Sequence, residues 1–134
     1  MFKSFFSKKK APLTGVPAVR RLKTYSAQSG YVYQYFYEGQ RPFSAGSESG
    51  TEFVFSMSGD RKTWHETAVL VGADALSSWE QSNGRALSST ERYAVAKMAL
   101  FQAFDERTNP SQMKEEVRAR AADVTAIAET LGLE

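Results

Sequence analysis

Hydrophobic and polar residues alternate with a period of two in the first half of the chain and with a period near 3.6 in the second half. Alternation is typical of β-strands, whereas a period of 3.6 is typical of helices that bury one face. The pattern predicts strands over residues 19–27, 31–38, 51–57 and 64–71. It predicts helices over residues 74–79, 89–107 and 110–131.

Turn-forming residues separate these elements. Residues 28–30 are a short hairpin connection containing Gly30, and residues 39–50 are predicted to form a loop rich in glycine and serine. Ser88 and Glu91 have the spacing of a capping box, which favours a helix start. Four strands followed by three helices predict an α+β fold, with a four-stranded antiparallel β-meander followed by three α-helices packed on one face.

The length of 134 residues favours one domain, which we expect to cover residues 18–134. Residues 1–17 are predicted to be a flexible basic arm, because two prolines and a glycine interrupt residues 11–17. No apolar run reaches ten residues, and no apolar segment follows the basic start as in a secretory signal. The cytoplasm is therefore the expected compartment.

The residue types present restrict the possible chemistry. The chain has no cysteine and one histidine, so we expect neither a metal nor a cofactor. His65 and Glu66 are neighbours on a predicted strand and point to opposite faces, which does not suit an acid–base pair. No short catalytic motif is present, and an enzyme is the least supported class of function.

Charge is distributed unevenly along the chain. Residues 1–37 contain seven bases and no acid, whereas residues 38–134 contain ten bases and fifteen acids, so +7 and −5 give the net +2. A basic end followed by an acidic body indicates either an anionic partner or an internal contact between the two parts.

The second predicted strand carries a tyrosine at every other position. Tyr31, Tyr33, Tyr35 and Tyr37 therefore share one face, while Val32 and Phe36 share the other. If the helices cover Val32 and Phe36, the tyrosines form an exposed aromatic surface for a protein partner or for stacked bases. If the helices cover the tyrosines instead, that surface does not exist.

The N-terminal arm offers a second candidate contact. In a helical conformation Phe2, Phe5 and Phe6 would share a face beside several lysines, which suits weak contact with an anionic membrane or docking on a protein. The other interpretation is a disordered, solubilising start.

The favoured function is a non-catalytic protein-interaction module for assembly with a partner protein or a second copy, and the alternative is single-stranded nucleic-acid binding on the same tyrosine face. The candidate contact residues are Tyr31, Tyr33, Tyr35, Tyr37, Arg20, Arg21 and Lys23, with Phe2, Phe5, Phe6, Lys8, Lys9 and Lys10 of the arm.

Overall fold

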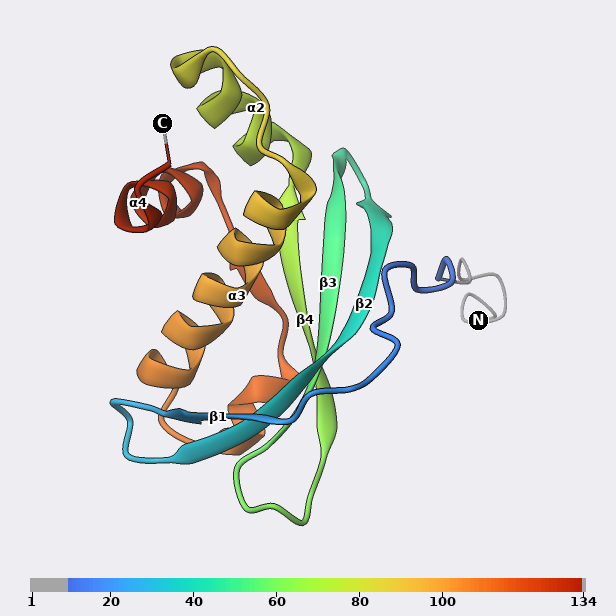
Figure 1. Cartoon of the computed structure of the whole chain (residues 1–134), viewed down its shortest axis with the longest axis vertical. Coiled ribbons are helices and arrows are strands. Elements are labelled where there is room, and N and C mark those ends of the chain that lie inside the picture. Colours follow the sequence, from blue (N-terminus) through green and yellow to red (C-terminus); the bar gives the residue numbers. More distant parts are fainter. Residues whose placement is uncertain (1–9, 134) are drawn as a thin grey trace.

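The computed structural model describes residues 10–133, which form a twisted five-stranded sheet with helices on one side (Figure 1). The strands are β1 (Lys23–Ser26), β2 (Val32–Ala45), β3 (Glu48–Ser58), β4 (His65–Gly72) and β5 (Val117–Ala119). The helices are α2 (Ala73–Asn83), α3 (Ser89–Glu106), the 3-10 helix η1 (Pro110–Lys114) and α4 (Ala121–Leu131).

The order of strands across the sheet follows the chain. Strands β1 to β4 pair antiparallel, and β5 runs parallel to β4 with Val117 opposite Val69. The α+β class and the antiparallel arrangement of four strands are confirmed, and a fifth strand extends the sheet. Within residues 10–133, no helix has the length and apolar character that a bilayer crossing requires.

Strands β2 and β3 form a hairpin longer than the sequence pattern predicts. The loop expected over residues 39–50 is strand except at Gly46 and Ser47, and residues 40–45 pair with residues 48–53. Gly46 turns the chain with φ of 63°, a conformation that glycine adopts without strain. The loop prediction was wrong because it relied on the alternation of apolar side chains. The hydrogen bonds between strands join backbone groups, so polar residues and glycine can form them as well.

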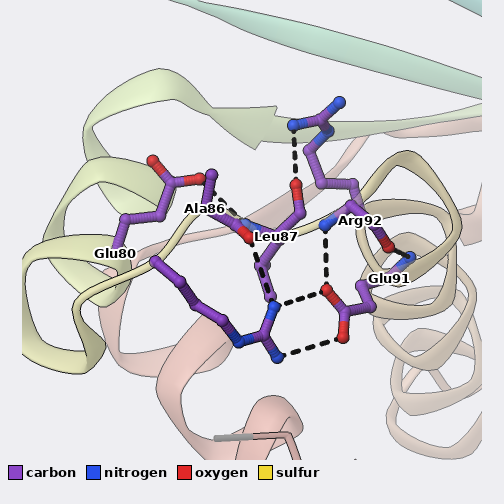
Figure 2. A network of polar contacts seen from close by, with 7 residues as sticks. Glu80, Ala86, Leu87, Glu91 and Arg92 are labelled. Atoms are coloured by element: carbon purple, nitrogen blue, oxygen red, sulfur yellow. Dashed lines mark hydrogen bonds and ion pairs between the residues drawn. The ribbon is translucent and has the colours of Figure 1, made fainter.

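The connection between α2 and α3 is fixed by a polar network (Figure 2). Ser88 Oγ accepts the Glu91 backbone N–H at 3.1 Å and Glu91 Oε1 accepts the Ser88 N–H at 2.8 Å, so the capping box is present. Arg85 donates to both carboxylate oxygens of Glu91, at 2.9 and 3.1 Å, and Glu80 accepts the N–H of Leu87 at 3.1 Å. Hydrogen bonds from Arg85 and then from Ser88 lower the pKa of Glu91 to about 2.

The single helix expected over residues 110–131 is replaced by η1, β5 and α4. Val117 and Ala119 are buried with Arg118 between them half-buried, which is strand alternation rather than a helical stripe. The Arg107 guanidinium caps this turn, since it donates at 2.8 Å to each of the carbonyl oxygens of Gln112, Glu115 and Glu116. In a continuous helix these carbonyl oxygens would accept hydrogen bonds from backbone N–H groups of the helix itself. The guanidinium therefore stabilises the non-helical conformation between η1 and β5.

The tyrosine face of β2 lies under the helices. Tyr33 and Tyr35 are 0% and 4% exposed. The Tyr33 ring stacks on Phe104 of α3 with 4.1 Å between centroids, and Tyr35 meets Phe101 edge-on at 5.7 Å. The expectation of an exposed aromatic surface was therefore wrong, because these large rings supply more apolar area to the core than the opposite set of side chains. Tyr31 alone of the four is exposed, at 37%.

Candidate functional site

Residues 15–22, here called the approach segment, leave the edge of β2 and return to it. Thr14 and Gln40 exchange two backbone hydrogen bonds of 2.7 and 2.9 Å, and Lys23 begins β1 opposite Tyr35. Eight residues, 15–22, thus span the same length of edge as the four residues 36–39 of β2. The surplus chain bends away and leaves part of the β2 edge without a paired strand.

A hollow of about 140 Å³ lies between the approach segment, β2 and α3. We call it the cationic hollow. Its walls combine aromatic rings with two basic side chains, and they consist of Pro17, Val19, Arg21, Lys23, Tyr35, Phe36, Tyr37 and Tyr93. Small-molecule and cofactor sites are commonly about 300–1,000 Å³, so this hollow has room for a single side chain rather than a whole ligand of that kind.

Two cations line this hollow and a third lies close to it. Arg21 and Lys23 line it, and Lys97 Nζ of α3 lies 6.0 Å from the Tyr35 ring centroid. None of the three forms an ion pair within residues 10–133. Burial, and then the nearby charge of Lys23, lower the pKa of Lys97. Positive charge is therefore concentrated here without a compensating acid.

Tyr37, one of the lining residues, carries an unpaired hydroxyl group. It is buried and has no hydrogen-bond partner among the described residues. Burial, and then the neighbouring Tyr93, raise the pKa of Tyr37 to about 12, so the group keeps its proton at neutral pH. The hydroxyl is thus both unpaired among the described residues and closed off from solvent.

The approach segment exposes apolar side chains around the hollow. Val16, Val19 and Leu22 are 52%, 67% and 55% exposed, and they fall within seven consecutive residues. We call these three side chains the apolar rim. Scattered exposed apolar residues are ordinary, but several together beside an unpaired strand edge are typical of a contact surface.

The sheet face opposite the helices carries charges that pair with one another. Glu52 meets Arg41 at 3.1 Å and Lys10 at 3.7 Å, and Glu38 meets Arg20 at 3.0 Å. A hollow of about 500 Å³ lies here, and its lining contains the bases Lys10 and Arg118 and the acids Glu52 and Glu116. This face therefore has no excess of either sign to select a charged partner.

The candidate residues from the sequence separate into three groups. Arg21, Lys23, Tyr35 and Tyr37 meet at the cationic hollow. Tyr33 belongs to the core, and Tyr31 directly precedes β2. Arg20 turns to the opposite face, with its guanidinium 5.2 Å from the Phe36 ring centroid. Phe2, Phe5, Phe6, Lys8 and Lys9 lie outside the described residues, whereas Lys10 is placed at Glu52.

The two contributions from α3 were not found from the sequence. The sequence pattern assigned no role to Lys97 or to Tyr93. Both lie more than fifty residues from Tyr35 in the chain, and no local pattern brings them together. Only the tertiary packing of α3 on β2 does so.

Within residues 10–133, no cluster of three or more histidine or acidic side chains is arranged to hold a metal ion. His65 is half-buried with its Nδ1 unpaired among the described residues, and burial lowers its pKa. Comparison of the chain with protein-family models, with curated proteins and with solved structures found no match.

Proposed function

We propose that this chain is a protein-interaction module without catalysis of its own, and that it binds a segment of a partner protein along the approach segment and the adjoining edge of β2. The observation that carries the proposal is the apolar rim, exposed beside a stretch of sheet edge that has no paired strand. An extended segment on such an edge gains main-chain hydrogen bonds and covers the rim.

The three side chains of the apolar rim are large enough for their burial to give a measurable binding affinity. Complete burial of a valine or leucine side chain contributes roughly 1.5–3 kcal/mol, and these three are more than half exposed in the free chain. Covering them yields several kcal/mol before the costs of association are subtracted, which is enough for a modest affinity.

Single-stranded nucleic acid is the alternative occupant, because Arg21, Lys23 and Lys97 carry unpaired positive charge. Base stacking would need accessible rings, and Tyr33 and Tyr35 are buried. The apolar rim therefore favours the protein partner.

The test is selection of binding peptides from a display library of random short sequences against the full chain, followed by titration of a selected peptide. The double variant Val19→Ser with Leu22→Ser should weaken binding by about tenfold or more, since about 1.4 kcal/mol corresponds to a factor of ten. Val32→Ser removes a valine that is 47% exposed outside the rim, and it should leave the affinity unchanged.

Failure to select any peptide, or equal losses in the rim variant and in Val32→Ser, would contradict the proposal. A parallel titration with oligouridylate and oligothymidylate tests the alternative. Binding to these oligonucleotides that weakens steeply with added salt, without peptide binding, would establish nucleic acid in its place.

A further inference from the structure

The cationic hollow presents hydrogen-bond donors and positive charge but no acidic side chain. Two acids of neighbouring elements are already engaged: Glu38 of β2 pairs with Arg20, and Asp105 of α3 accepts hydrogen bonds from the Tyr25 hydroxyl at 2.8 Å and the Gln28 N–H at 2.9 Å. The charges of the hollow are thus left for a group that the described residues do not supply.

Resting on the proposed function, we propose that the cationic hollow receives the carboxylate of a glutamate or aspartate on the bound partner segment. Arg21 offers a planar guanidinium and Lys23 offers an ammonium group in the lining, and Lys97 lies close by, with its Nζ 6.0 Å from the ring centroid of the lining residue Tyr35. A carboxylate accepts several such bonds at once.

The dimensions and the walls of the hollow also favour an acidic side chain. About 140 Å³ admits one side chain, and Phe36, Tyr37 and Val19 provide apolar contact for its methylene groups. Val19 belongs both to the hollow and to the apolar rim, so a segment lying on the rim passes the mouth of the hollow. The bound partner therefore carries an acid next to its apolar contacts.

Lys97 gives the inference a direct readout. Burial and the charge of Lys23 hold its pKa below the usual value in the free chain. A carboxylate bound nearby stabilises the protonated amine, so the pKa of Lys97 rises when the segment binds. This change can be followed by NMR of the Lys97 side chain.

The experiment measures the binding of the full chain to two matched libraries of short random peptides. One library has glutamate at the fixed central position, and the other has glutamine there. The glutamate library should bind about fivefold or more tightly, and Lys97→Gln and Arg21→Gln should each reduce that preference. Lys62→Gln is the matched control, because Lys62 is an exposed lysine in the turn before β4 and forms no ion pair in the described chain.

The possible outcomes separate the two proposals. Equal binding of both libraries, together with loss of binding in the rim variant, would overturn the carboxylate inference and leave the proposed function standing. No binding of either library would overturn the proposed function itself. A third library with phosphoserine at the fixed position that binds more tightly than the glutamate library would assign the hollow to phosphate and overturn the carboxylate.

Discussion

At the scale of single residues, two tyrosines that pack in or against the core differ in what their hydroxyl groups meet. The Tyr25 hydroxyl donates to Asp105 at 2.8 Å, whereas the Tyr33 hydroxyl is buried without a partner among the described residues. A made hydrogen bond stabilises a fold by about 1 kcal/mol, while an unsatisfied buried hydroxyl costs free energy. The two hydroxyls therefore act on stability with opposite signs.

Phenylalanine substitutions test this difference. We expect Tyr25→Phe to lower the free energy of unfolding by about 1 kcal/mol, because Asp105 loses a donor. Tyr33→Phe should leave that free energy unchanged or raise it, since its ring can still stack on Phe104. Urea denaturation of the two variants checks the prediction, and equal losses would contradict it.

Three tyrosines packed in or against the core give the fold a dependence on alkaline pH. Burial is the largest cause that raises the pKa of Tyr25, Tyr35 and Tyr37, each from 10.0 to about 12. In the unfolded chain these groups lose their protons near pH 10, two units before the folded chain does. The stability is therefore complete below pH 10 and falls as the pH rises from 10 to 12. Thermal denaturation at several pH values measures the loss, and a melting temperature constant across that window would refute the explanation.

Part of this residue-scale picture could be predicted from the sequence. The alternation of Tyr31, Tyr33, Tyr35 and Tyr37 placed them on one face, but it did not say which face is inward. The deciding contacts come from Phe101 and Phe104 on α3, which are distant in the chain. The unpaired hydroxyl of Tyr37 could not be predicted for the same reason.

At the scale of elements, α3 shows how local sequence specifies a boundary. Ser88 and Glu91 satisfy each other's backbone N–H groups, and Arg85 holds the Glu91 carboxylate. All of these partners lie within seven positions of one another, so the helix start could be predicted from spacing alone.

Removing the serine hydroxyl should weaken this start. We expect Ser88→Ala to lower the free energy of unfolding by about 1 kcal/mol, because the Glu91 N–H loses its acceptor. Ser78→Ala, at an exposed position inside α2, is the control and should cost nothing, since alanine favours helix interiors. Chemical denaturation of both variants decides the matter, and similar losses would argue against a capping role for Ser88.

The path from η1 to α4 shows the limit of the same reasoning. Met113, Val117, Ala121 and Val124 have helical spacing in the sequence, yet only the last two belong to α4. Val117 instead faces the core from β5. The backbone of β5 pairs with β4, and this pairing cannot be recognised in the sequence. The periodic pattern therefore predicted the burial of Val117 correctly, but it placed this residue in a helix rather than in a strand.

At the scale of the whole molecule, the candidate site is assembled from segments far apart in the chain. The approach segment, β2 and α3 each supply part of the cationic hollow. Arg21 and Lys23 could be predicted from the sequence as contact residues, because they are basic. Their proximity to Tyr93 and Lys97 could not be predicted. That placement depends on the packing of α3 and on the bridge between Thr14 and Gln40.

Gly39 is where this arrangement can be tested. Its φ is 141°, and a Cβ would lie 2.9 Å from the Thr14 carbonyl oxygen. We expect Gly39→Ala to lower the free energy of unfolding by about 1–3 kcal/mol and to speed hydrogen exchange at the Thr14 and Gln40 amides.

Gly72→Ala is the matched control for that substitution. Gly72 has an ordinary φ of −69° and open space where a Cβ would lie, and it is the N-cap of α2, where alanine is less favourable than glycine. Its replacement should leave hydrogen exchange at the Thr14 and Gln40 amides unchanged, with any loss of stability confined to the start of α2. If both variants exchange these amides at the rate of the original chain, the close approach at Gly39 does not hold the segment.

The lengths of the strands have a consequence for how copies of the chain behave in a crowded solution. The sheet ends in β1 of 4 residues and β5 of 3 residues, and the 11-residue β3 is enclosed between β2 and β4, while β1 covers only residues 32–35 of the 14-residue β2. Both terminal strands carry a cation, Lys23 in one and Arg118 in the other. Short charged margins discourage the addition of further strands at β1 and at β5, and the enclosed β3 is kept from seeding fibrous aggregates.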